Sequence, residues 1–321
     1  MSKLVSLLIG AALLSAGATA DAQTTAGKGI RLVVPSPPGS FNDTIARALV
    51  QNFNEGFAPG SYTDNKPGAG TVIGTDFVAK SAPDGRTLLI VSFPFSVMGE
   101  LYPGAKIDVL KDFAPVIYIG FTPSLLIVNT ALPYRTVKDL VEAAKAKPGS
   151  ILYGSTSNGS SGHLVMERFK SLTGTSLVHV PFKGSSEELT ALIGGQVPVA
   201  FVNLPEGLPF VTSGRVRALG IAAAKRYEAI PDVPTMAEAG FSGFEANIWF
   251  GIVVPAATPK ETIVKLNAEI NRVLATAEVR KLFRSREAQI VGGTPEAFGD
   301  YLRGLVAGWG KVVRDSKIKA E

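Results

Sequence analysis

The sequence contains no cysteine and only two histidines among its 321 residues. Disulfide bonds therefore cannot stabilise the fold, and thiol catalysis and thiolate metal sites are excluded. The histidines, His163 and His179, have no recognisable metal-ligand spacing, so no metal site is expected. A Ser/His/acid hydrolase would need one of them beside a nucleophile. Ser160 lies near His163 in sequence, but no carboxylate is evident to orient the imidazole.

Long apolar runs are also scarce. The apolar stretch of residues 4–14 is shorter than the roughly 20 residues that a membrane-spanning helix needs. It follows Lys3 and precedes small residues, with Ala-x-Ala sites at 18–20 and 20–22. We therefore interpret residues 1–22 as a signal peptide. Since no cysteine follows, a lipid anchor is not expected, and the mature protein should be exported to the periplasm.

Several nucleotide and catalytic motifs are missing. The net charge is only +5, from 32 basic and 27 acidic side chains, and no basic run is interleaved with aromatics. Nucleic acid is therefore a poor candidate partner. There is no P-loop and no G-x-S-x-G elbow, and the glycines at 68, 70 and 74 miss the spacing of a dinucleotide fingerprint. We expect no cofactor.

Apolar strand-like runs alternate with helical patterns along the chain, which predicts an α/β fold. About 300 mature residues are close to the size at which one core divides into two. The apolar segments 125–128 and 250–254 are the expected crossings between two lobes. Lobe 1 would comprise residues 23–124 and 251–321, and lobe 2 residues 125–250. Pairs of residues typical of capping boxes occur at Thr136/Asp139 and Ser185/Glu188.

Three times a strand-like run leads through a Gly/Ser-rich turn into a helix, at residues 35–43, 154–162 and 181–186. Helix N-termini present unpaired N–H groups and a positive dipole end, so converging turns would hold a small anion. Asp43 could be imagined as a general base, but capping or bracing the following helix fits it better. Asn203 ends a buried strand, at the edge where α/β folds bind ligands.

An ordered series of short motifs spans nearly the whole mature chain. It comprises LVVPSPPG (32–39), NKPGAG (65–70), APDG (82–85), DFAP (112–115), YGS (153–155), NGSS (158–161), HL (163–164), HVPFKG (179–184), GGQ (194–196), PDVPT (231–235), EAG (238–240), WFG (249–251) and LNAEI (266–270). In these motifs the chain resembles the periplasmic solute-binding receptors of tripartite tricarboxylate transporters, the Bug proteins.

The resemblance implies a two-lobed, type II periplasmic-binding-protein-like α/β fold with its ligand cleft between the lobes. It implies a carboxylate ligand, membrane permease partners, no enzymatic activity and a monomer. The ligand-binding residues that it implies, together with neighbouring candidates, are Pro38, Gly39, Ser40, Phe41, Asp43, Phe93, Ser155, Ser160, Ser161, Gly184, Ser185 and Asn203.

The chain departs from the family pattern at a few of these positions. Ser40 replaces the second glycine of the first turn, and Phe41, Phe93 and Phe95 stand where small or polar residues are usual. These rings either line an apolar wall that would suit an aromatic dicarboxylate of phthalate type, or simply pack in the core. Asn203 stands where an acid is common, which argues against amino-acid ligands. The rival function is a periplasmic hydrolase of carboxylate esters that uses the same cleft.

Overall fold

The computed structural model describes residues 29–319, and the expected signal peptide lies outside them. Strands and helices alternate as the sequence predicts. The strands are β1 (Arg31–Val34), β2 (Tyr62–Asn65), β3 (Thr87–Ser92), β4 (Phe113–Asn129), β5 (Ile151–Ser155), β6 (Leu177–Pro181), β7 (Val199–Asn203), β8 (Val216–Ile221), β9 (Asn247–Pro255) and β10 (Gln289–Ile290). The helices are α1 (Phe41–Asn52), α2 (Val72–Ala79), α3 (Phe93–Leu101), α4 (Val137–Ala146), α5 (Ser161–Thr173), α6 (Ser185–Ile193), α7 (Leu204–Thr212), α8 (Lys260–Leu274), α9 (Ala277–Ser285) and α10 (Pro295–Asp315). A short π-helical turn spans Phe53–Phe57, and 3₁₀ turns span Ala69–Thr71 and Pro103–Ala105.

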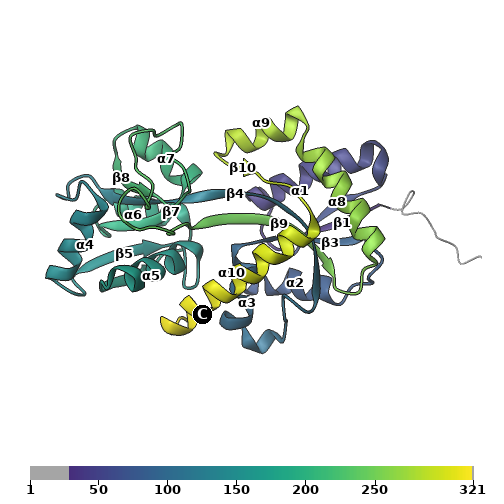
Figure 1. Ribbon diagram of the computed structural model, residues 1–321, viewed down its shortest axis with the longest axis horizontal. Helices are drawn as coiled ribbons and strands as arrows, with labels where there is room; N and C mark the ends of the chain where they lie inside the picture. Colours follow the sequence, from purple (N-terminus) through teal and green to yellow (C-terminus); the bar gives the residue numbers. More distant parts are fainter. Residues whose placement is uncertain (1–28, 320–321) are drawn as a thin grey trace, which may run out of the picture.

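Two lobes lie side by side, and β4 and β9 run between them (Figure 1). The strand order is β2-β1-β3-β9-β4-β7-β5-β6, with β8 and β10 also paired to β4. β1, β2 and β3 are mutually parallel, as are β5, β6 and β7, whereas β4 and β9 are antiparallel to their neighbours. Each lobe is therefore a parallel α/β unit, and an antiparallel pair joins the two units.

β4 changes partners along its length. Its first part pairs with β9 from Phe113 opposite Pro255 to Pro123 opposite Asn247. From Ser124 onward its neighbours are β7 and β8. Every residue from 122 to 129 is buried, as expected for a strand that is covered on both faces.

The hydrophobic core is continuous through this joining pair. One large cluster includes Val33 of β1, Ile252 of β9 and Phe169 of α5. A smaller cluster on lobe 2 packs Leu125 and Ile127 of β4 against the residues around α6 and α7. Length alone suggested separate cores, but the shared strands carry buried side chains from one lobe into the other.

The two capping-box predictions had different outcomes. At α4 the box is confirmed, because the Thr136 side chain accepts from Asp139 N and the Asp139 carboxylate accepts from the Thr136 backbone. At α6 it is wrong: Gly184, with φ of 105°, is the N-cap residue. The Lys183 N–H donates to Glu187 Oε2 at 2.8 Å, and Glu188 turns inward and is 1% exposed.

Within residues 29–319, no helix combines the length and apolarity needed to cross a bilayer.

Candidate functional site

A cavity of about 420 Å³ lies between the lobes, where lobe 1 faces the start of α7. It is bounded by the β1–α1 turn, by the joining strands, by the end of α9 and by the first residues of α7. Its lining residues are Ser36, Gly39, Ser40, Phe41, Asn42, Ser92, Thr122, Asn203, Pro205, Glu206, Ile248, Phe250 and Arg286. Of the residues expected from the sequence, the lining contains Gly39, Ser40, Phe41 and Asn203.

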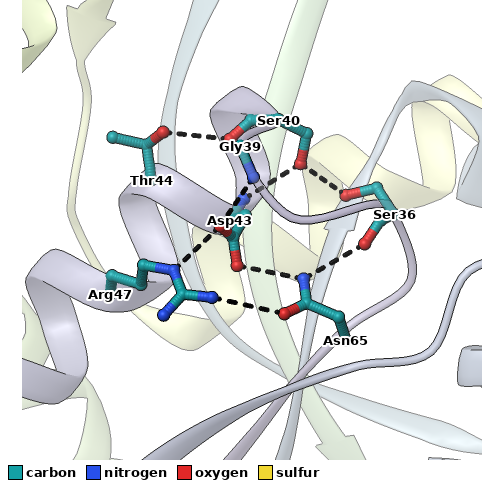
Figure 2. A network of polar contacts seen from close by, with 7 residues as sticks. All are labelled: Ser36, Gly39, Ser40, Asp43, Thr44, Arg47 and Asn65. Carbon is teal, nitrogen blue, oxygen red and sulfur yellow. Dashed lines mark hydrogen bonds and ion pairs between the residues drawn. The ribbon is translucent and has the colours of Figure 1, made fainter.

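Asp43 holds the first turn in shape (Figure 2). It is 2% exposed, and its Oδ2 accepts from the Gly39 N–H and from Arg47 Nε, both at 2.9 Å. Its Oδ1 accepts from Asn65 Nδ2 at 2.9 Å. Burial alone would raise the pKa of this carboxyl, but the bonds from Arg47, Gly39 and Asn65 outweigh burial and hold the pKa below its ordinary value. Asp43 therefore braces the turn, as the capping interpretation predicted.

Ser40 is the N-cap of α1. Its Oγ accepts from Asp43 N at 3.2 Å and lies 2.7 Å from Ser36 Oγ. Because Asp43 takes the Gly39 N–H, the donors left for a ligand are the first-turn N–H groups of Phe41 and Asn42 and the two hydroxyls. These donors, at the positive end of a 12-residue helix, form a corner that is suited to an anion.

The Asn42 amide adds a further polar group to this corner. Its Nδ2 donates to Ser92 Oγ at 3.3 Å, and its Oδ1 is buried without a partner among the described residues. The Asn42 Oδ1 atom can therefore accept a hydrogen bond from a donor group of a ligand, whereas it cannot bond to a carboxylate.

An aromatic wall adjoins the corner. The Phe41 ring packs edge-on against Phe250, with centroids 5.0 Å apart, and also contacts Phe283 at 5.7 Å. The Arg286 guanidinium lies 6.0 Å from the centroid of the Phe41 ring. With Ile248, these rings give the cavity one apolar side, next to a cation that can meet a carboxylate.

The opposite wall belongs to lobe 2 and carries an acid. Glu206 lies in the first turn of α7, where Asn203 is the N-cap residue. Ser185 and Asn203 hydrogen bond to its carboxyl group, which lowers its pKa, although burial has the larger effect and raises it. Ser185 therefore contacts the site only by its hydrogen bond to Glu206 and does not line the cavity.

The other two Gly/Ser turns lie behind this wall and contact each other. The Gly184 N–H donates to the Thr156 carbonyl at 3.3 Å, and the Ser160 side chain caps α5 by accepting from His163 N. Ser161 is the first residue of α5. Neither turn contributes to the cavity lining.

Ser155 and the two histidines form a network in which Ser155 and His163 are buried and His179 is half-buried. Ser155 is 0% exposed, and its Oγ lies 2.6 Å from His179 Nε2 and donates to the Ser157 carbonyl. The His163 and His179 rings stack with centroids 3.7 Å apart. Burial lowers the pKa of each imidazole to about 4, and for His163 the neighbouring His179 contributes. The serine–histidine pair is therefore closed to substrate and serves the packing of lobe 2.

The remaining candidates fall outside the cavity. Phe93 is 1% exposed and packs on Trp309, and Phe95 is 2% exposed and packs on Phe113. Of the three unusual phenylalanines, only Phe41 lines the cavity, and the packing interpretation holds for the other two. Pro38 is exposed one residue before the lining Gly39.

Sequence reasoning missed Glu206, Arg286, Asn42 and Phe250. Glu206 had a local signal, because Leu204-Pro205-Glu206 directly follows a buried strand and places an acid in a helix first turn. Arg286 had no local signal. It lies more than 240 residues after the first turn in the sequence, and only the packing of α9 brings it to the cavity.

Comparisons with known proteins agree with this architecture. The family model described as "Tripartite tricarboxylate transporter family receptor" matches residues 45–317. Protein BugT of Bordetella pertussis is 36% identical over 99% of this chain and 99% of its own length. The structure of R. palustris Rpa4515 with adipate is 33% identical, with a TM-score of 0.76, covering 91% of this chain and 99% of that one. MatC from Rhodopseudomonas palustris with bound malate is 28% identical, with a TM-score of 0.74, covering 89% and 99%. With the two-lobed fold and the match of sequence along its length, this chain belongs to the receptor family of tripartite tricarboxylate transporters, a family of transport receptors and not of enzymes.

Proposed function

We propose that this chain is a periplasmic solute-binding protein that captures a carboxylate and delivers it to the permease subunits of a tripartite tricarboxylate transporter. The ligand is a mono- or dicarboxylate, aromatic acids of phthalate type included. The observation that carries the proposal is the N-terminus of α1 at the interlobe cavity, with Arg286 beside it. Both favour an anion. The relatives named with adipate and malate support the same ligand class.

Export and assembly complete the proposal. Residues 1–22 are the signal peptide that directs the chain to the periplasm, and the mature protein acts as a monomer. We assign residues 23–124 and 251–321 to lobe 1 and 125–250 to lobe 2. The change of β4 partners after Pro123 supports the first of these boundaries.

Isothermal titration of the purified mature protein tests the ligand class. A carboxylic acid that binds should bind in the presence of a chelator, and its methyl ester should bind at least tenfold more weakly, because the ester cannot accept charge-assisted bonds from the α1 N-terminus. Equal affinity for acid and ester would contradict the proposal.

Ligand should also close the lobes, because only a ligand that contacts both walls favours the closed state. Small-angle scattering with saturating ligand is expected to give a smaller radius of gyration than the free protein. An unchanged radius would place the ligand on one lobe alone.

The aromatic wall gives a separate test of selectivity. Phe41→Leu should lower the affinity for terephthalate relative to adipate, since the edge contact with Phe250 is lost and a ring no longer has a flat partner. Phe57→Leu is the control, because Phe57 packs on Phe53, away from the cavity. An unchanged ratio in Phe41→Leu would assign that ring to packing.

A further inference from the structure

The two walls of the cavity carry opposite charge. On lobe 1, the α1 N-terminus and the Arg286 guanidinium are positive. On lobe 2, the acidic residue Glu206 lines the same cavity. Among the ion pairs of the described residues, none joins Glu206 to Arg286, although both line one cavity. A ligand that bridges the walls therefore meets a cationic end and an acidic end.

The hydrogen bonds to the Glu206 carboxyl group are of the kind that stabilises its charged form. The Ser185 hydroxyl and the Asn203 amide both hydrogen bond to its carboxyl group, from α6 and from the end of β7. Its position in the first turn of α7 also favours negative charge. A carboxylate with two donors keeps further lone pairs that can accept from a ligand in the cavity that Glu206 lines.

A second acid lies behind it. Glu188 of α6 is 1% exposed, and its Oε1 has no partner within the described structure. Burial, with the nearby charge of Glu206, raises the pKa of Glu188 to about 8. Burial favours the neutral form of both acids, but only Glu206 also has hydrogen-bond donors, on Ser185 and Asn203, that favour its charged form.

We propose that Glu206 is the specificity-determining residue of the cleft and selects carboxylates that carry an ammonium group at their far end. This inference rests on the proposed function. The ligand carboxylate meets the α1 N-terminus and Arg286, an apolar or aromatic middle lies along Phe41 and Phe250, and the ammonium donates to Glu206. A second carboxylate at that end would face a like charge.

This inference reverses an expectation drawn from the sequence. The absence of an acid at position 203 argued against amino-acid ligands. The acid is instead three residues further on, where the first turn of α7 brings it to the wall that Asn203 also lines. Asn203 contributes by hydrogen bonding to Glu206.

Matched ligands test the proposal in calorimetry at pH 7. Two pairs differ only at one end: 6-aminohexanoate with adipate, and 4-(aminomethyl)benzoate with terephthalate. In the wild-type protein the amino acid of at least one pair should bind at least about tenfold more tightly than its diacid, since a charge-assisted contact replaces a like-charge one. Glu206→Gln should remove that preference. Glu142→Gln is the control, because Glu142 is an exposed residue of α4 in a surface pair with Lys138.

The outcomes separate this inference from the proposed function. If diacids bind and the amino acids bind no better, or if Glu206→Gln keeps the ammonium preference, the inference is overturned while carboxylate capture stands. If none of the four compounds binds, and the protein binds other diacids more tightly than the matching amino acids, the inference is again overturned. If no carboxylate of a broad library binds, the proposed function fails and this inference fails with it.

Discussion

Replacing Asp43 by asparagine should show how much the hydrogen bonds of its carboxylate to the first turn stabilise the protein. The substitution keeps the shape of the side chain but turns one acceptor oxygen into an NH₂ group. That group must then face a donor, either Asn65 Nδ2 or the pair formed by Gly39 N–H and Arg47 Nε. A lost bond to a buried charged group costs about 1.5–3 kcal/mol, so we expect the free energy of unfolding to fall by about 2 kcal/mol.

Asp76→Asn is the matched control. Asp76 also pairs with a basic residue four positions away, Lys80 at 2.7 Å, but the Asp76 side chain is 36% exposed and that of Lys80 is 74% exposed. Such a pair contributes about 0.5 kcal/mol or less. Urea unfolding at pH 7 measures both variants, with an unchanged m-value as the check that only stability has changed.

The pH dependence of the same measurement adds a second criterion. The pKa of Asp43 is lowered in the folded protein, so its contribution is complete above the ordinary aspartate pKa and is lost as the pH falls through the folded value. The difference between wild type and Asp43→Asn should therefore shrink below about pH 4. If Asp43→Asn and Asp76→Asn cost the same at pH 7, the bracing role of Asp43 is refuted. Carboxylate affinity should fall in the first variant only.

Three other measurements follow from the same physical reasoning. Burial raises the pKa of Glu188 from 4.5 to about 8, so between these values the folded state binds the proton more tightly, and the unfolding free energy should fall as the pH rises from 4.5 to about 8. Glu188→Gln should flatten this decline, and an unaltered slope would contradict the assignment. Burial lowers the pKa of His179 to about 4, so stability should decrease as the pH drops from about 6.5 towards 4, and His179→Gln should reduce that loss in thermal unfolding curves. Gly120→Ala would put a methyl group 2.1 Å from the Gln289 carbonyl oxygen and should lower the free energy of unfolding by at least about 2 kcal/mol. Gly99→Ala, at an exposed helix position with open space, should raise it by about 0.5–1 kcal/mol. Similar effects of the two substitutions would refute the close approach of β10 to β4.

Features that depend on residues close together in the chain were predictable. The Thr136/Asp139 box of α4 and the brace formed by Asp43 need only partners within about four residues, apart from Asn65. The Ser185/Glu188 pattern has the same spacing as a box, yet the chain uses it differently. The Ser185 side chain hydrogen bonds to Glu206, and Glu188 turns into the core. Contacts with residues distant in the sequence therefore determine the roles of Ser185 and Glu188, which their spacing alone does not predict.

The cavity itself could not be assembled from the sequence. Its apolar side combines Phe41 with Phe250, and its cation comes from Arg286, so three distant segments must pack before any of them has a role. Phe93, like Phe41, is the first residue of a helix and follows a serine at the N-cap. Only the packing of Phe93 on Trp309 distinguishes a core ring from one beside the cleft.

The unbroken course of β4 and β9 through both lobes determines how this molecule can move. A hinge made of loops rotates with little resistance, but here every degree of rotation between the lobes must twist a hydrogen-bonded two-stranded ribbon. The pairing register shifts between Pro115 and Ile117 and between Tyr118 and Gly120, and at these points the hydrogen-bond ladder is interrupted. A change in the angle between the lobes would therefore be taken up as twist along this ribbon and not in a loop.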